Sequence, residues 1–409
     1  MSEFNHERPM VMHIDLNSCF ATVEQQARPL LRGKPVAIVN RRTEHTAIVT
    51  ASYEAKAKGV KVGMKLREAR LLCPDIIALE SDPAKYRYVY HRLLDIMNDY
   101  SAHVTMKSID EGVIDFHTAT ADMQARDLGE IGHEIKRRLK EEIGVWMRCN
   151  IGIATNRFLA KTAAGLHKPD GLDVITPENL EAVLGSMKLT DLTGIARQNE
   201  KRLRSVGIDT PLDFLHADVV TLEKIVFKSV VGRWWYQRLR GWEVDDVAHD
   251  MKRVGRQYVL ERFDLTHKEV TQRLHHLCES VGSRLRSQQK SARGIYVYAK
   301  SPTQGYWHRS SLSTLPFYSD QTIFSQARQL FEAAPSDPKE IGIHCYELEP
   351  IDDSQVSLFN DQIVQERQMT GAIDDINKRW GERTIHSADT LETGIYINTK
   401  IPFGSTRYL

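Results

Sequence analysis

The feature that most constrains this sequence is an acidic residue at the end of one predicted strand and a pair of acidic residues at the bend of a later predicted hairpin. The apolar run 10–14 ends at Asp15, and the polar turn after it leads into a helix-like stretch. Two β-prone stretches flank Asp110 and Glu111 and indicate a hairpin with both acids at its bend. If these strands are neighbours in a sheet, the fold brings three carboxylates together.

Strand and helix patterns alternate around these acids through about residue 176. Such alternation is typical of helices packed on a sheet, so we expect an α+β core with one inserted lobe near residues 30–80. The predicted strands are 35–39, 46–51 and 149–153, and the predicted helices are 52–58, 83–100, 128–143 and 156–166.

The remaining chain divides into further parts, and the fold class is therefore α+β and multidomain. Glycine-punctuated helical patterns over 177–243 predict a small helical domain, and the acidic stretch 244–252 predicts a linker. Mixed patterns over 253–350 predict a second α+β domain. Residues 351–409 are rich in polar residues and predict a weakly packed tail.

Charge is unevenly distributed along a chain whose formal net charge is only +1. Residues 251–310 hold twelve Lys and Arg against four Asp and Glu, whereas 351–409 hold six against nine. The first segment is expected to face phosphate and the second is not; a solvated basic face without a partner is the alternative.

Cysteine usage and hydropathy bear on the compartment. The five cysteines are widely spaced and form no paired pattern, so we expect buried free thiols in a reducing environment. No signal peptide and no membrane-spanning run is predicted, which favours a cytoplasmic protein with no membrane partner.

Carboxylates at neighbouring strand ends are suited to magnesium. Mg²⁺ takes hard oxygen ligands and is usually held by a few carboxylates together with substrate phosphates. Two such ions can activate a hydroxyl and neutralise a leaving pyrophosphate. Asp15, Asp110 and Glu111, with the backbone carbonyl of Leu16, can supply these ligands; an isolated acid of this kind is more often a turn former.

The segments 15–24 and 108–111 resemble the two catalytic motifs of the Y-family DNA polymerases, in particular those of bacteria. Residues 50–64 resemble the fingers motif of that family, and 151–171 resemble its late palm motif, in the same order along the chain. The resemblance extends to about residue 350 and is densest over the first 175 residues.

This resemblance implies a right-hand polymerase fold and assigns each part of the chain to one of its domains. They are a palm (1–29 and 81–176), small fingers (30–80), a helical thumb with a helix-hairpin-helix (177–243), a linker (244–252), an α+β little finger (253–350) and a C-terminal tail (351–409). The implied activity is template-directed addition of dNTPs to a primer 3' end, in translesion synthesis and DNA repair, with two Mg²⁺ ions per site and Mn²⁺ as a substitute.

The resemblance also assigns individual residues. Asp15, Asp110 and Glu111 are implied catalytic metal ligands, and Phe20 is the implied steric gate that excludes a 2'-hydroxyl. The implied contacts to the incoming triphosphate are Thr50, Tyr53, Lys56 and Lys168, whose hydroxyl and ammonium groups can donate to phosphate oxygens.

Three positions and one short segment depart from the usual family pattern. In the segment, Gly112, Val113 and Ile114 replace a usual aromatic-containing run after the acids. Asn17 stands where many members carry Asp, and Lys56 replaces the usual Arg and so loses a two-pronged contact. Ala196 occupies the place of the second glycine of the helix-hairpin-helix, where a Cβ would disfavour positive φ and crowd a phosphate.

The predicted DNA contacts come from two regions. Gly194 and Ile195 belong to the helix-hairpin-helix, whose backbone amides would approach phosphates. The basic segment of the little finger supplies Lys252, Arg253, Arg256, Arg284, Arg286 and Arg293.

The pentapeptide 355–359 resembles the motif by which bacterial polymerases bind the sliding clamp. Gln355 is the expected anchor, and Leu358 and Phe359 are expected to fill a hydrophobic cleft. The expected partners are thus primer-template DNA, dNTPs and the clamp, with the chain itself a monomer.

Two other functions stay open at this point. The first is a catalytically silent, polymerase-like scaffold that links DNA and the clamp, and the second is another palm-type enzyme such as a nucleotidyl cyclase. The three carboxylates argue against the scaffold, and the helical and basic segments argue against the cyclase.

Overall fold

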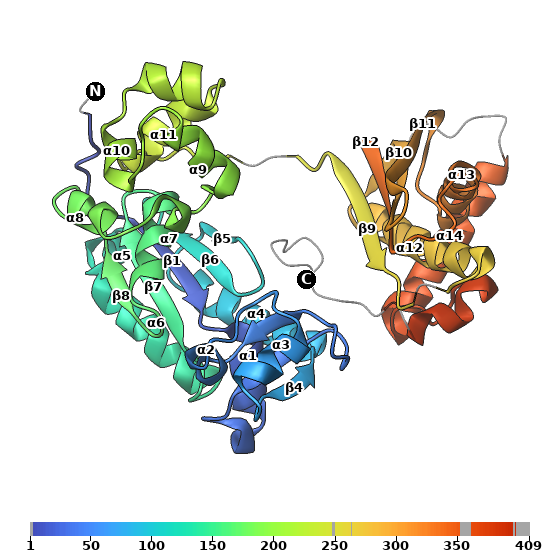
Figure 1. Cartoon of the computed structure of the whole chain (residues 1–409), viewed down its shortest axis with the longest axis horizontal. Helices are drawn as coiled ribbons and strands as arrows, with labels where there is room; N and C mark the ends of the chain where they lie inside the picture. Colours follow the sequence, from blue (N-terminus) through green and yellow to red (C-terminus); the bar gives the residue numbers. More distant parts are fainter. Residues whose placement is uncertain (1–2, 248–249, 263, 352–360, 396, 398–409) are drawn as a thin grey trace. The chain divides into compact units, whose positions relative to one another are not determined.

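The computed structural model describes residues 3–247, 250–262, 264–351, 361–395 and 397 (Figure 1). Its residues form two compact units, one ending at Val247 and one that begins in the chain after it. Each unit has a hydrophobic core of its own, so the two are treated separately.

The first unit is built on a five-stranded sheet in the order β5-β6-β1-β7-β8. The central strand β1 pairs antiparallel with β6 and with β7, and β8 runs parallel to β7. The strands are β1 (Val11–Leu16), β5 (Val104–Met106), β6 (Glu111–Asp115), β7 (Cys149–Ala154) and β8 (Leu172–Val174).

Helices cover both faces of this sheet because alternate residues of β1 belong to two different cores. Met12, Ile14 and Leu16 pack with the helices α1 (Cys19–Ala27), α4 (Pro83–Asn98) and α6 (Leu128–Glu142). Val11 packs on the other side with α7 (Arg157–Leu166). Side-chain caps start three of these helices: Asp82 caps α4, Asp127 caps α6 and Asn156 caps α7.

A smaller lobe interrupts this core between α1 and α4. Its sheet has the order β3-β2-β4, formed by β2 (Val36–Val39), β3 (Ile48–Ala51) and β4 (Ile77–Glu80). The 3₁₀ turn η1 (Pro29–Leu31) leads into it, and α2 (Tyr53–Ala57) and α3 (Leu66–Leu72) complete it. Ser52 caps α2 by accepting a hydrogen bond from the Ala55 amide, as its position before the helix predicts.

A helical region follows β8 and shares one core with α7. Trp235 is buried there against Phe158 and Phe214. Its elements are α8 (Leu180–Gly185), η2 (Leu189–Asp191), α9 (Arg197–Arg204), α10 (Pro211–His216), the π-helical η3 (Thr221–Val226) and α11 (Val231–Leu239); the short α5 (Ala121–Ala125) lies earlier in the chain.

The second unit is an antiparallel sheet in the order β11-β10-β12-β9 with helices on one face. The strands are β9 (Arg253–Val259), β10 (Lys290–Ser301), β11 (Gly305–Phe317) and β12 (Glu340–Pro350); the helices are α12 (His267–Ser287), α13 (Asp320–Phe331), α14 (Asp361–Trp380) and the 3₁₀ segment η4 (Ala388–Ile395). The predicted α+β character of both units is confirmed.

The expectation of a weakly packed tail is wrong for the part of it that reaches from α14 to η4. Asp374 accepts a hydrogen bond from Arg286 at 2.6 Å, and Thr393 contacts His276 at 2.7 Å. Arg383 forms an ion pair with Glu279 of the same helix α12. These contacts are polar and join the tail to the distant helix α12, so the pattern of hydrophobic residues in the sequence could not predict them.

The structure bears on two of the features expected from sequence, the free cysteines and the lack of a membrane-spanning segment. All five cysteines are buried free thiols, as predicted. Among the described residues, no helix is both long enough and apolar enough to cross a membrane.

Candidate active site

Strand pairing brings the three predicted carboxylate residues together. In the antiparallel register of β1 and β6, Asp15 is the partner of Glu111. The amide of Leu16 donates to the carbonyl oxygen of Asp110 at 2.8 Å, so the hairpin bend lies against the end of β1. The expectation that these acids lie at neighbouring strand ends is confirmed.

Glu111 is held by two cationic or polar side chains from the same sheet and from α7. Its Oε2 accepts a hydrogen bond from Lys161 Nζ at 2.6 Å and lies 3.3 Å from His13 Nε2. Burial raises the pKa of this carboxyl, but the hydrogen bonds from His13 and Lys161 outweigh burial and bring the pKa to about 2. Glu111 is therefore ionised at neutral pH.

Asp110 has the opposite environment. Ser108 Oγ donates to its Oδ1 at 2.5 Å, and the residue is half-buried. Burial raises the pKa of Asp110; the Ser108 hydrogen bond opposes this rise, and repulsion from Asp15 and Glu111 adds to it. A cation at this position would relieve that repulsion.

Asp15 is paired with a lysine from the loop after α7. Lys168 Nζ lies 2.6 Å from Asp15 Oδ2. Two of the three carboxylates thus have an ammonium partner, one from Lys161 and one from Lys168. The acids are close enough to repel one another, and lysines neutralise their charge in part.

The donor set fits a hard divalent cation in its chemistry: carboxylate oxygens at two strand ends beside the backbone of Leu16. In the part of the chain that the structure describes, no three His, Cys, Asp or Glu side chains converge as a metal site requires. The carboxylates of Asp15 and Glu111 are turned to lysines instead. Lys161 and Lys168 thus each pair with one oxygen of these two carboxylates, Oε2 of Glu111 and Oδ2 of Asp15.

The predicted triphosphate contacts lie beside this centre. Lys56 Nζ donates to Ser18 Oγ at 2.7 Å and lies 4.7 Å from the centre of the Tyr53 ring. Burial and repulsion from Lys168 lower the pKa of Lys56, while attraction to Asp15 opposes the change. Thr50 is half-buried in β3, the strand that directly precedes helix α2 with Tyr53 and Lys56. Tyr53, Lys56 and Lys168 thus gather around Asp15.

Phe20 is buried in the core of the first unit. Its side chain is 3% exposed and its ring stacks on Tyr86 at a centroid distance of 4.1 Å. This packing fixes the ring close to the end of β1. The assignment as a steric gate stays a prediction.

Asn17 has a structural function in this chain. It is 1% exposed, its amide nitrogen donates to Asn150 Oδ1 at 2.9 Å, and its Oδ1 accepts from the backbone amide of Asp170 at 2.7 Å. Asn17 thereby holds the loop that carries Lys168. An amide side chain has both a donor nitrogen and an acceptor oxygen and so makes both bonds, which accounts for Asn at this position.

Sequence reasoning missed two residues of the site. Lys161 lies within the segment 151–171 that resembles the late palm motif, but the resemblance assigns it no function. His13 is two residues before Asp15 on β1, so the strand period places both on one side of the sheet. That period, and the position of Lys161 on the helix after β7, were the signals available.

The backbone at Gly194, in the segment assigned to a helix-hairpin-helix, requires a glycine. Gly194 has φ +98°, and a Cβ there would meet the Trp235 ring at 3.1 Å. Ile195 is buried. Ala196 precedes α9 with φ −92°, an ordinary value for alanine, so the missing second glycine imposes no backbone strain.

The predicted DNA-gripping arginines of the second unit need one clear correction. Arg286 is 9% exposed and paired with Asp320 at 2.7 Å and Asp374 at 2.6 Å, so its assignment to phosphate is wrong. Its charge stabilises the packing of α14 on α12 instead.

The other predicted basic residues differ in exposure. Arg256 donates a hydrogen bond to Ser280 Oγ. Burial is the main cause that lowers the pKa of Arg256 to about 10, and repulsion from Arg284 adds to it. Arg284 donates to the Gly255 carbonyl at 2.8 Å. Lys252 and Arg253 are exposed, as is Arg293 beside Glu349. Contact with DNA stays a prediction for all five of these residues. The clamp residues Gln355, Leu358 and Phe359 lie outside the described residues.

Comparison with known proteins bears on both units. Residues 14–165 match the model of the impB/mucB/samB family, and residues 251–358 match that of the impB/mucB/samB family C-terminal domain. The matched segments contain the three carboxylates and the sheet of the second unit.

Curated relatives align over nearly the whole chain. DNA polymerase IV of Moorella thermoacetica is 32% identical over 93% of this chain and 96% of the relative. DNA polymerase IV of Oceanobacillus iheyensis is 28% identical over 94% and 93%, and DNA polymerase IV 1 of Bacillus subtilis is 27% identical over 94% and 93%.

A solved structure shares the fold. The Y-family DNA polymerase chimera Dbh-Dpo4(243-245)-Dbh matches with a TM-score of 0.69 and 22% identity, over 82% of this chain and 98% of the chimera. At this identity the likeness concerns the fold alone.

Replacing Asn17 by Asp should destabilise the chain by about 2 kcal/mol, because a buried carboxylate would face the Asn150 oxygen and lose a donor. The measurement is thermal or urea unfolding of the first unit. Asn179→Asp is the matched control, since Asn179 also donates to a carbonyl but is only half-buried, and that hydrogen bond is exposed to solvent. An Asn17→Asp chain as stable as the unmodified one would contradict the structural function assigned to this amide.

Proposed function

The chain belongs to the impB/mucB/samB family, the Y-family of DNA polymerases, and on that premise we propose that it extends a primer 3' end on a DNA template with the carboxylates of Asp15, Asp110 and Glu111. It is a DNA-directed DNA polymerase of the translesion synthesis and DNA repair class. The buried free thiols suit action in the cytoplasm.

The observation that carries the proposed site is the register of β1 with β6. It sets Asp15 opposite Glu111 and the Asp110 backbone against Leu16. Two Mg²⁺ ions, or Mn²⁺ in their place, would be held by these three carboxylates and the Leu16 carbonyl, and would activate the 3'-hydroxyl and neutralise the leaving pyrophosphate.

The neighbouring lysines supply the complementary charge. Lys168, whose Nζ lies 2.6 Å from Asp15, and Lys56, whose pKa is lowered by burial and by repulsion from Lys168, would contact the triphosphate oxygens together with Thr50 and Tyr53. When Lys168 turns to phosphate, it leaves Asp15 free to act as a metal ligand. Nucleotide binding and metal binding would therefore support each other.

The family's function requires these carboxylates, whereas a scaffold that only links DNA and clamp does not. A scaffold gains nothing from a site in which Asp110 stays close to two other acids and has a raised pKa. The polymerase is therefore the better account of the geometry.

The double change Asp110→Ala with Glu111→Ala should abolish primer extension, with a loss of at least about a thousandfold, since it removes two of three metal-binding side chains. Extension of a labelled primer with dNTPs and Mg²⁺ measures it. Asp122→Ala with Glu130→Ala, two exposed acids of the same unit, is the control. An unmodified chain that folds and binds DNA but extends no primer would favour the scaffold.

Phe20→Leu should raise ribonucleotide incorporation relative to deoxyribonucleotides by about tenfold or more, because a smaller side chain under the sugar leaves room for a 2'-hydroxyl. Single-nucleotide insertion with dNTP and rNTP gives the ratio. Phe116→Leu tests for a general core effect, since Phe116 is a fully buried ring of the same core. Equal discrimination in both variants would make Phe20 a core aromatic only.

We also propose that residues 355–359 bind the bacterial sliding clamp through Gln355, Leu358 and Phe359. The chain on either side of this peptide is anchored: the Ile351 amide donates to the Gln289 carbonyl at 2.9 Å, and Asp374 of α14 pairs with Arg286. The clamp can then hold the second unit directly at the primer end.

Leu358→Ala with Phe359→Ala should weaken clamp binding at least about tenfold, because both apolar anchors are removed. Surface plasmon resonance with immobilised clamp is the measurement. Leu391→Ala is the matched control, since Leu391 is 65% exposed in η4 of the same unit. Undiminished binding by the double variant would contradict this assignment.

A further inference from the structure

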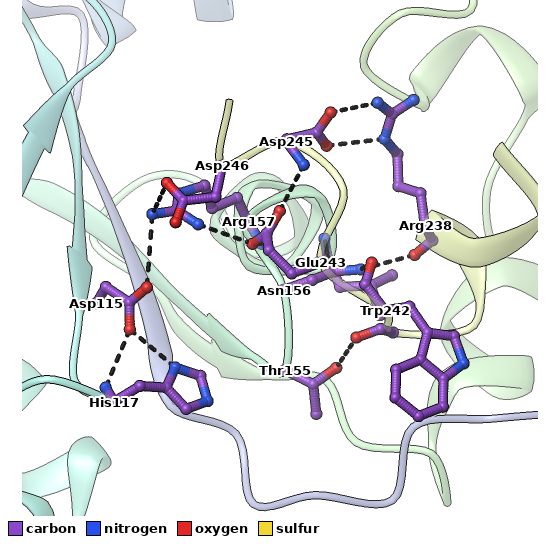
Figure 2. A network of polar contacts seen from close by, with 12 residues as sticks. Asp115, His117, Thr155, Asn156, Arg157, Arg238, Trp242, Glu243, Asp245 and Asp246 are labelled. Carbon is purple, nitrogen blue, oxygen red and sulfur yellow. Dashed lines mark hydrogen bonds and ion pairs between the residues drawn. The ribbon is translucent and has the colours of Figure 1, made fainter. Parts of the chain in front are cut away.

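Arg157 joins three carboxylates that come from two distant parts of the first unit (Figure 2). Its guanidinium lies 2.7 Å from Asp246, 3.1 Å from Glu243 and 3.5 Å from Asp115. Asp115 is the last residue of β6, whereas Glu243 and Asp246 follow the helical region and lead toward the second unit. The Arg157 side chain is 8% exposed and Asp115 is 13% exposed, whereas Asp246 is 65% exposed, so the cluster is buried at its arginine and open to solvent at Asp246.

Backbone contacts hold the same segment to the start of α7. Glu243 also accepts a hydrogen bond from the Arg157 amide at 2.9 Å, where an acid is favoured at a helix N-terminus. Asn156 donates to the carbonyl of Trp242 at 2.9 Å, and Thr155 donates to that of Gly241 at 2.9 Å (Figure 2). The chain from Gly241 to Asp246 is thus docked on the palm helix.

The charges make this docking depend on Arg157. One guanidinium faces three acids, so without it Asp115 would repel both Glu243 and Asp246 across a partly buried space. The neighbouring Arg238 pairs with Asp245. Loss of the Arg157 pairs should therefore release the segment from β6.

The docking shortens the connection between the units. β9 begins at Arg253, so the part left between Asp246 and β9 is residues 247–252, whereas a tether released at Glu243 would comprise 243–252. At ~3.4 Å per extended residue, the reach falls from ~34 Å to ~20 Å. The volume available to the second unit then shrinks about fivefold, with a matching rise in its effective concentration at bound DNA.

We propose that Arg157 is a positioning residue: it fixes the root of the inter-unit tether through Glu243 and Asp246 and so increases the affinity for primer-template DNA without acting in the chemical step. The effect on DNA rests on the proposed polymerase function, whereas the anchoring itself does not. The first third of the segment predicted as a linker, residues 244–246, is on this account part of the palm.

The test removes the anchor from the tether side, in Glu243→Gln with Asp246→Asn, so that β6 and α7 keep their own residues. The control, Glu130→Gln with Glu141→Gln, loses the same charge from exposed positions of the first unit. Spin labels at Asp122→Cys and Lys268→Cys, both exposed, report the distance between units, because the native thiols are all buried.

The expected result is a broader distance distribution in the anchor variant alone, with the KM for primer-template raised about fivefold and kcat at saturating DNA changed less than about twofold. An unchanged distance distribution would overturn the anchor, and so would a lowered kcat at unchanged KM. If the unmodified chain proved inactive, the polymerase function would fail, while the distance measurement would still decide the anchor.

Discussion

The register of β1 between β6 and β7 is the constraint on which the site depends. Because Asp15 pairs with Glu111 and the Leu16 amide bonds to Asp110, a slip of one residue would turn the acids to the opposite face and bury them in a core. The alternation of Met12, Ile14 and Leu16 toward one core resists that slip. Hydrophobic packing thus fixes where the charges lie.

The concentration of negative charge at this point is balanced by residues from three other elements. Lys161 on α7, Lys168 in the loop after it and Lys56 on α2 surround the acids, and Asn17 with Asn150 holds the Lys168 loop in place. An enzyme that binds a polyanion with cations needs such exchangeable pairs. On the proposed mechanism, the lysines would pass from carboxylate to phosphate as metal ions bind, which would keep the local charge nearly balanced.

Much of this could be predicted from sequence, because strand and helix periods and the acids at strand ends are local signals. The strands near Asp15 and Asp110, the Ser52 cap and the need for glycine at Gly194 were all accessible in this way. Pairings between distant polar residues were not. Arg286 looked like a DNA contact until Asp374, 88 residues away, proved to be its partner, and nothing local to Arg157 indicates Asp246.

The account makes its most direct claim about where cations bind, and an anomalous difference map from crystals with primer-template DNA, a non-reactive dNTP analogue and Mn²⁺ would test it. The account predicts two manganese peaks bounded by Asp15, Asp110 and Glu111, with Lys168 moved from Asp15 to the triphosphate and Lys161 withdrawn from Glu111. Manganese bound elsewhere, with both lysines still on these carboxylates, would contradict it.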